Sequence, residues 1–293
     1  MPKNKMLFAY FLLLAFCFQA CDLGGGDKAI PAYLSVNSFD FQTQEDTQGS
    51  NSSKFTDVQV YINNQNIGIY PLPASIPVLS EGLTKIDLKP VFWKNGISAL
   101  RTVSLLHTFY TENISLSPDQ TYTIEPTVTY VDDAEFPLIS DFELGNPFVA
   151  TENSVSLQTT ADAEIVFAGE RSFWTTLQSG AAKDKIEMFT GNTYAVDLTQ
   201  KRAYIEMDYR CDAVFEVFMN SLKFNGSGWD ITPVHLLYLN TRSDWNHVYF
   251  DLTDAMASVQ GDAYNFGLSM ELPDSLQTAS LGLDNFKIVF INR

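Results

Sequence analysis

The chain has 293 residues, and its 18 basic residues against 35 acidic residues give a formal net charge of −17 at pH 7. Nucleic acids and anionic lipid headgroups bind cationic patches, so this charge balance argues against both as partners. It is compatible with metal ions or carbohydrate as ligands, and the chain is long enough for two packed cores.

The first 20 residues have the organisation of a secretory signal peptide. Lys3 and Lys5 precede an apolar run over residues 6–18, and the small residue Ala20 stands just before Cys21. A basic start, a short apolar core and a small residue at the cleavage site form this pattern. The apolar run is shorter than the roughly 20 residues that a membrane-spanning helix needs. We therefore expect no transmembrane helix in the mature chain.

Cys21 is followed by Asp22 and three consecutive glycines. This segment resembles the lipobox of bacterial lipoproteins, in which the cysteine is acylated and becomes the new N-terminus, although Phe18 stands where the family usually has leucine. The resemblance implies that Cys21 is the lipidation site, that residues 21–29 are a flexible tether, and that the protein is anchored in an outer membrane. The periplasmic and cell-surface faces both stay open. The alternative is ordinary cleavage near Ala20, which would release the chain from the membrane.

The cysteine count predicts a fold without disulfide bonds. Cys17 leaves with the signal peptide, Cys21 is expected to carry lipid, and Cys211 then has no partner. At the end of an apolar strand face, Cys211 is predicted to be a small core residue.

Residues 30–130 are predicted to form an antiparallel β-sandwich, because short alternating runs recur about every ten residues. A hairpin turn is expected at 63–66, and the prolines within 71–77 argue against an interior strand there. Three stretches, 30–34, 56–62 and 72–79, resemble the membrane-proximal immunoglobulin-like domains of lipoproteins from Bacteroidota. This resemblance implies lineage and placement and carries no chemistry.

The acidic segment 131–137 is predicted to be a linker, and residues 138–293 a second, larger β-sandwich. Its strands are longer, as in 203–209, where apolar and polar residues alternate. Only residues 254–260 have a weak helical pattern. The whole mature chain is therefore expected to be all-β.

Three segments of the second domain, 139–143, 168–174 and 281–288, resemble the galactose-binding-like jelly rolls, the fold of many carbohydrate-binding modules. In that fold the first and last strands pair, and acids at their ends often hold a structural calcium ion. The resemblance makes Asp141, Glu143 and Asp284 the candidate calcium ligands. Calcium takes six to eight oxygen ligands, so backbone carbonyls would have to complete the shell. The alternative is that Asp284 merely begins a strand and Glu143 is solvated.

A sugar site needs aromatic faces and a few planar polar groups on an exposed surface. The candidates are Trp229 with Asp230, Trp174 with Arg171, and Trp245. Trp229 is the strongest, because an aromatic residue in a glycine-rich loop is more often a contact residue than a core residue. For Trp245 a packing role is favoured, and Trp174 could have either role.

No catalytic pattern is present in the sequence. His107, His235 and His247 lack metal-ligand spacing, are each expected to be half-buried on strands, and no glycine-x-serine-x-glycine or phosphate-binding loop occurs. Residues 206–208 are similar to the Glu-x-Asp-x-x-Glu strand of jelly-roll glucanases, but Cys211 takes the place of the third acid and cannot protonate a leaving group. Alternating charge along a strand is the favoured explanation, so we predict no enzymatic activity.

Two hypotheses remain, both for a non-catalytic, lipid-anchored protein of the cell envelope. In the first, the second sandwich binds a ligand, with glycan the favoured class. In the second, the protein is a structural accessory subunit of an outer-membrane protein complex. Exposed tryptophans on one face would favour the first hypothesis, and a continuous apolar patch would favour the second.

Overall fold

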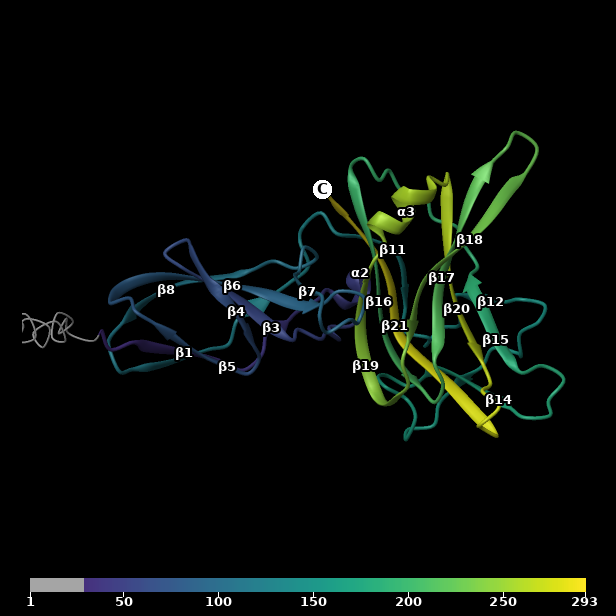
Figure 1. Ribbon diagram of the computed structural model, residues 1–293, viewed down its shortest axis with the longest axis horizontal. Helices are drawn as coiled ribbons and strands as arrows, with labels where there is room; N and C mark the ends of the chain where they lie inside the picture. The colour runs from purple at the N-terminus through teal and green to yellow at the C-terminus, as the bar shows by residue number, and fades with distance from the viewer. Residues whose placement is uncertain (1–28) are drawn as a thin grey trace, which may run out of the picture.

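The computed structural model describes residues 29–293. The predicted signal peptide, the predicted lipidation site Cys21 and nearly all of the predicted tether lie outside the described residues. The chain is almost entirely β, as predicted, and its strands form two β-sandwiches that follow each other in the sequence (Figure 1). Within residues 29–293, no helix reaches the length and hydrophobicity that a membrane span requires.

The first sandwich is built from two groups of strands. Sheet β5-β1-β9 and the pair β10-β2 form one side, and sheet β4-β3-β6-β7, with β8 also on β6, forms the other. Two of its pairings, β1 with β9 and β2 with β10, are parallel, and the others are antiparallel. The elements are β1 (Ala32–Val36), β2 (Asp40–Phe41), α2 (Glu45–Gln48), β3 (Asp57–Ile62), β4 (Gln65–Pro71), β5 (Ala74–Val78), β6 (Gly82–Trp93), β7 (Arg101–Val103), β8 (Tyr110–Leu116), β9 (Thr121–Ile124) and β10 (Thr127–Val128).

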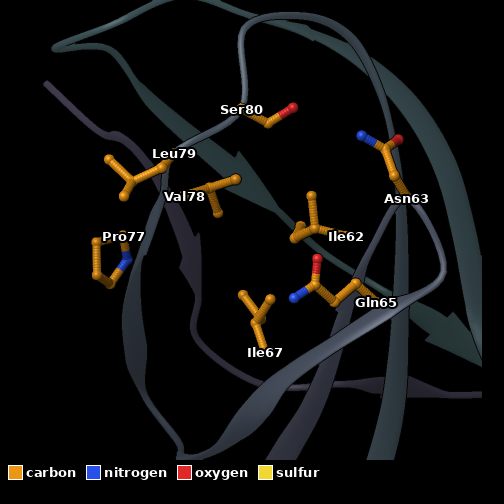
Figure 2. Close-up of a pocket in the computed structure, with 8 residues that line it drawn as sticks. All are labelled: Ile62, Asn63, Gln65, Ile67, Pro77, Val78, Leu79 and Ser80. Carbon is orange, nitrogen blue, oxygen red and sulfur yellow. The ribbon is translucent and has the colours of Figure 1, made fainter. Parts of the chain in front are cut away.

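The predicted hairpin turn is confirmed, and it joins β3 to β4. Asn63 and Asn64 both have positive φ angles between the paired residues Ile62 and Gln65, as a two-residue hairpin turn requires. A groove lies beside this turn, between the hairpin and β5 (Figure 2). Strand β5, which contains Pro77, is at the edge of its sheet, where a missing N–H donor is tolerated.

The second sandwich consists of two packed sheets. The six-strand sheet has the order β13-β14-β21-β16-β19, with β11 also on β21, and the five-strand sheet has the order β12-β15-β20-β17-β18. The first strand, β11, pairs with the last, β21, as the jelly-roll resemblance implied. The elements are β11 (Glu135–Ser140), β12 (Phe148–Ala150), β13 (Thr159–Thr160), β14 (Ser172–Gln178), β15 (Lys185–Thr190), β16 (Lys201–Cys211), β17 (Phe215–Phe224), β18 (Trp229–Leu239), β19 (Arg242–Asp251), α3 (Thr253–Val259), β20 (Ala263–Glu271) and β21 (Thr278–Asn292).

Two details differ from the sequence-based expectation or refine it. Strand β11 begins at Glu135, inside the range 131–137 that was expected to be a linker. The weak helical pattern corresponds to α3, a short helix between β19 and β20.

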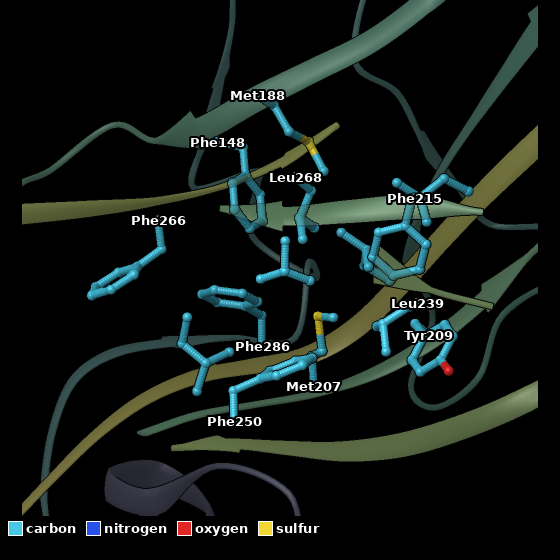
Figure 3. Close-up of a cluster of buried hydrophobic side chains, with 14 of the residues drawn as sticks. Phe148, Met188, Met207, Tyr209, Phe215, Leu239, Phe250, Phe266, Leu268 and Phe286 are labelled. Carbon is cyan, nitrogen blue, oxygen red and sulfur yellow. The ribbon is translucent and has the colours of Figure 1, made fainter. Parts of the chain in front are cut away.

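The core of the second sandwich lies between its two sheets and is filled by large side chains (Figure 3). The alternation predicted from the sequence produces this core: Met207 from β16 and Phe215 from β17 point inward, and the residues beside them point outward. Cys211 is buried in the same core as a free thiol, which confirms its predicted role as a small hydrophobic residue.

The first sandwich packs against the outer face of the six-strand sheet. Tyr204, Tyr249 and Val289, which lie on that face, belong to the buried hydrophobic cluster of the first sandwich. The loop after β6 also joins the exposed edge of β19, where the Asn95 N–H donates to the carbonyl of Tyr249 at 2.9 Å and Lys94 pairs with the carboxylate of Asp251 at 2.9 Å. The first sandwich therefore covers part of the sheet face and protects the edge of the sheet.

Charged side chains are buried at this contact. The Lys287 ammonium donates to the carbonyl of Ser50 at 2.6 Å and to the Tyr130 hydroxyl at 3.0 Å, and that hydroxyl donates to the Glu206 carboxyl at 2.7 Å. Burial lowers the pKa of Lys287, and the nearby carboxyl groups of Glu206 and Asp208 partly oppose this. The polar face of β16 is therefore enclosed between the two sandwiches rather than solvated.

Candidate functional site

The outer face of the five-strand sheet carries a groove with a volume of about 230 Å³, which we call the sheet groove. It lies on the side of the second sandwich that the first sandwich does not cover. Its lining combines two aromatic rings with carboxyl, amide and hydroxyl groups from four strands and the end of β12: Thr151, Glu187, Phe189, Glu216, Phe218, Asn220, Pro233, Val234, His235 and Ser269.

Strand register brings the aromatic residues of the sheet groove together. Phe189 of β15 is paired with Gly267 of β20, which is paired with Phe218 of β17, and Phe218 is paired with His235 of β18. These four positions form one row across the sheet, with their side chains on the outer face. The residues that alternate with them, such as Met188, point into the core.

Gly267 allows the floor of the groove to form. A Cβ atom at this position would lie 2.2 Å from Cζ of Phe218, well inside the distance of any ordinary contact. The ring of Phe218 therefore lies across β20 over Gly267 instead of standing upright from its own strand. The result is a half-buried aromatic surface in the middle of the sheet.

Two carboxyl groups flank this aromatic surface. Glu187 accepts a hydrogen bond from the Thr151 hydroxyl at 2.7 Å and forms an ion pair with Lys185 at 2.6 Å. Burial acts to raise the pKa of Glu187, but the hydrogen bonds from Lys185 and Thr151 outweigh it and leave the pKa lower than usual. Glu216 contacts Nδ1 of His235. The groove therefore presents an ionised carboxylate, paired with the Lys185 ammonium, beside its aromatic floor.

An amide pair lies next to the aromatic row. Asn220 of β17 donates from Nδ2 to Oδ1 of Asn265 of β20 at 2.9 Å, across the same outer face. The amide of Asn220 lines the groove and keeps further donor and acceptor capacity for a ligand. Aromatic, amide and carboxylate groups in one concave site can bind a small polar molecule that has an apolar face.

A second aromatic pair lies on the same outer face, at the tip of the β17–β18 hairpin. Phe224 of β17 is paired with Trp229 of β18, and both lie on the same outer face as Phe218. Phe224 is six positions after Phe218 along β17, which is about 20 Å at the usual rise of a strand. Trp229 is 52% exposed, and its ring makes an edge-to-face contact with Phe224 at 5.4 Å. Pairing with β20 ends at Leu222, so the tip projects beyond the sheet (Figure 1).

The other predicted residue of this segment, Asp230, has a different position. It is the next residue along β18, and successive side chains of a strand point to opposite faces, so Asp230 does not share the face of Trp229. Its carboxylate accepts a hydrogen bond from the side chain of Asn225 at 2.8 Å across the hairpin turn. In the sequence Trp229 was expected in a loop, and the structure has it as the first residue of a strand.

Trp174 and Trp245, the two other predicted tryptophans, lie together on the outer face of the six-strand sheet. A Cβ atom at Gly282 would approach the ring of Trp174 to 2.7 Å and that of Trp245 to 3.0 Å, so both rings cover this glycine. Both are half-buried. The structure therefore groups Trp174 with Trp245 and separates both from Trp229, which is on the opposite sheet.

Trp245 has the half-buried position that its favoured packing role implies, whereas Trp174 has a different neighbour from the expected one. Nε1 of Trp245 donates to the carbonyl of Ile165 at 3.1 Å, which holds its ring in place. The cation over the ring of Trp174 is Arg210, at 5.4 Å from the ring centre. Arg171, the expected neighbour, instead donates to the Thr159 hydroxyl at 2.7 Å.

The three candidate calcium ligands, Asp141, Glu143 and Asp284, line one pocket of about 170 Å³ between the six-strand sheet and the first sandwich. One Glu143 oxygen accepts hydrogen bonds from the backbone N–H groups of Glu170 and Arg171, at 2.7 and 3.0 Å.

Asp284 is also engaged within the protein. It accepts a hydrogen bond from the Ser172 hydroxyl at 2.6 Å, and burial raises its pKa to about 7. Across residues 29–293 no three His, Cys, Asp or Glu side chains are arranged to hold a metal ion. Glu143 and Asp284 thus accept hydrogen bonds from groups of the protein itself, and calcium binding stays a prediction.

The histidines differ from the sequence-based expectation that each is half-buried. His107 and His247 are fully buried at the contact between the sandwiches, and the His235 side chain is 75% exposed at the sheet groove. This prediction was wrong because the alternation along a strand cannot tell which faces a second domain covers.

The sequence matches no protein-family model and no curated protein. Among solved structures, it is similar to carbohydrate-binding modules from a β-sandwich superfamily, with 14% identity, a TM-score of 0.36, and 79% of this chain and 84% of that chain covered.

Two further similarities are to TmCBM61 in complex with β-1,4-galactotriose and to the family 30 carbohydrate-binding module of a cellulosomal cellulase of Clostridium thermocellum. TmCBM61 has 10% identity and a TM-score of 0.33, with 50% of this chain and 92% of that chain covered. The family 30 module has 14% identity and a TM-score of 0.33, with 51% and 88% covered. At these low values the similarities carry no argument, and the proposals below rest on the residues of this chain.

Proposed function

We propose that this chain is a lipid-anchored, non-catalytic protein of the outer membrane in a member of the Bacteroidota, and that its second sandwich binds glycan through the sheet groove. The observation that carries the proposal is the ring of Phe218, which covers Gly267 between carboxylate and amide groups. Anchoring through Cys21 rests on the lipobox resemblance of residues 18–21.

The chemistry of the sheet groove suits a sugar ring. A pyranose has an apolar face of C–H groups, which packs on an aromatic ring, and a rim of hydroxyl groups, which need donors and acceptors. Phe218 and Phe189 supply the aromatic surface, and the amide of Asn220, held by Asn265, supplies donors and acceptors. Lys185 is already paired with Glu187 and is not a free cation for an anionic sugar. We therefore infer a neutral glycan as the ligand.

Residues 206–208, which are similar to the Glu-x-Asp-x-x-Glu strand of jelly-roll glucanases, are buried, and this supports a binding protein rather than an enzyme. Glu206 and Asp208 lie under the first sandwich, where no polysaccharide can reach them. Their hydrogen bonds to Tyr130 and Ser52 give them a structural role at the domain contact.

A glycan array with the purified chain tests the proposal. We expect binding to a neutral glycan, and Phe218→Ala should weaken it at least about tenfold, which corresponds to about 1.4 kcal/mol. Phe109→Ala is the matched control, because Phe109 is an exposed phenylalanine on the first sandwich. Binding that survives Phe218→Ala, or an array without any hit, would argue against the proposal.

The tip of the β17–β18 hairpin favours a second candidate function, that of an accessory subunit. Phe224, Trp229 and Ile231 are all exposed there and share one face, which forms an apolar surface that a protein partner could cover. Affinity purification from detergent-solubilised outer membranes, followed by mass spectrometry, distinguishes the candidates. A stoichiometric membrane-protein partner that is lost in Trp229→Ala would support the accessory role.

A further inference from the structure

The end of the first sandwich where the described chain begins exposes three large apolar side chains. Ile30 precedes β1, Leu79 follows β5, and Leu83 lies at the start of β6; their exposed fractions are 59%, 73% and 77%. The pairing of Ala32 with Val78 brings the first two segments side by side, and Leu83 is across the turn from Leu79. We call these three residues the apolar tip.

The groove shown in Figure 2 adjoins the apolar tip and has a volume of about 370 Å³. Side chains from the β3–β4 hairpin and from β5 face one another across it, among them Ile62, Ile67 and Val78, with Leu79 at its rim. The exposed side chains of the apolar tip and the apolar part of the groove therefore form one apolar patch, bordered by the polar side chains of Asn63, Gln65 and Ser80. Soluble monomers seldom leave such a surface uncovered unless it has a partner.

The position of this surface in the chain identifies its partner, on the premise of the proposed function that Cys21 carries lipid. Residues 21–28 lie between the acylated position and the first described residue, and eight residues span at most about 28 Å. β1 begins at the end of the first sandwich that faces away from the second (Figure 1). The apolar tip is therefore held within reach of the bilayer, which gives it a high effective concentration there.

We propose that the apolar tip inserts into the interface of the bilayer that holds the acyl chains of Cys21. The charged side chains around it are Glu81 and Asp119, together with Lys85, which is paired with Asp87 at 3.1 Å. Among residues 29–293, this surface offers no free cluster of cations to anionic headgroups. The contact is therefore apolar, and salt does not release it. It fixes the first sandwich on the membrane and holds the second sandwich, with its sheet groove, at the far end.

A single fluorescent label tests the proposal on the full lipidated chain. The free thiol of Cys211 is buried, so a cysteine introduced at the surface is labelled selectively. We would label Leu83→Cys, and separately Leu79→Cys, with an environment-sensitive dye and reconstitute the protein in phosphatidylcholine vesicles that carry a quencher just below the headgroups. Ser227→Cys, at the exposed tip of the β17–β18 hairpin, is the control. We expect at least twofold quenching at positions 79 and 83, unchanged by 0.5 M salt, and none at 227.

Three results would overturn the proposal, and they separate its failure from that of the proposed function. Unquenched dye at both tip positions, in protein whose mass shows acylated Cys21, refutes the membrane contact and leaves the lipid anchor intact. A blue shift of the dye emission that appears in dilute detergent and grows with protein concentration identifies a second copy of the chain as the partner of the apolar tip. A mass without acyl groups on Cys21 removes the anchor itself. Glycan binding by the second sandwich is independent of all three.

Discussion

Gly267→Ala is the smallest substitution that tests the geometry of the sheet groove. The added Cβ atom would lie 2.2 Å from Cζ of Phe218 and 2.6 Å from the carbonyl oxygen of Met188. Carbon atoms in ordinary contact are about 3.5–4.0 Å apart, so the ring has to move by about 1.5 Å. The Met188 oxygen belongs to the backbone of β15, so the spacing of the strands has to change as well.

Overpacking of this kind costs about 1–3 kcal/mol, and we expect the free energy of unfolding to fall by this amount. For a protein of this size the melting temperature falls by about 2–4 °C for each kcal/mol. Glycan affinity should fall too, because the displaced ring no longer covers Gly267 to form the floor of the groove. Gly228→Ala is the control and should be neutral, because no atom lies within 4 Å of its added Cβ.

The double variant with Phe218→Ala separates the two contacts. Without the ring, Gly267→Ala should cost less, and the part that persists should come from the Met188 carbonyl. Urea unfolding of the wild type, both single variants and the double variant measures this coupling. Wild-type stability together with wild-type glycan affinity in Gly267→Ala would refute the placement of Phe218 over Gly267.

Three predictions concern the buried groups. Lys287→Met removes the cation near the buried carboxyl of Glu206 and should lower the free energy of unfolding, measured in urea, by about 3–5 kcal/mol. Lys201→Met removes a partly exposed ion pair and should cost less than about 1 kcal/mol in the same assay. Equal losses in the two variants would contradict the buried network. Burial raises the pKa of Cys211 to about 11, so iodoacetamide at pH 8 should modify it only after unfolding, as mass spectrometry would detect. Burial, with smaller contributions from nearby cations, lowers the pKa of His107 well below 6.5, so the unfolded chain binds a proton that the folded chain excludes. Its contribution to stability is therefore lost as pH falls below about 6.5, and His107→Gln should reduce the difference in urea midpoint between pH 5 and pH 7.5; an unchanged difference would refute this role.

Local alternation in the sequence predicted the fold class well, and β16 shows why it could not predict the contact between the two sandwiches. The pattern over residues 203–209 correctly places Met207 in the core. It cannot show that the opposite face, with Glu206 and Asp208, is buried too. The covering side chains include Ser52, which is 156 residues from Asp208 in the sequence. A pattern within one strand carries no information about a surface so distant in the chain.

The candidate site was harder to predict because it depends on strand register. Phe189, Gly267, Phe218 and His235 lie on four strands, and each alone has the ordinary outward position of a strand residue. A shift of one residue in any pairing would break up the row, and sequence alternation alone does not fix that pairing. Trp174, Trp229 and Trp245 were predicted as site residues from their neighbours in the sequence, and only Trp229 of the three shares a face with the sheet groove.

The central claim is that the second sandwich binds glycan through the sheet groove on its five-strand sheet. Isothermal titration of the best glycan from the array into the wild type, Phe218→Ala and Trp174→Ala tests it most directly, because Phe218 and Trp174 lie on opposite outer faces. We predict that Phe218→Ala weakens binding at least about tenfold and that Trp174→Ala leaves the dissociation constant unchanged. Loss of binding in Trp174→Ala, with full affinity in Phe218→Ala, would contradict the claim and place the ligand on the other sheet.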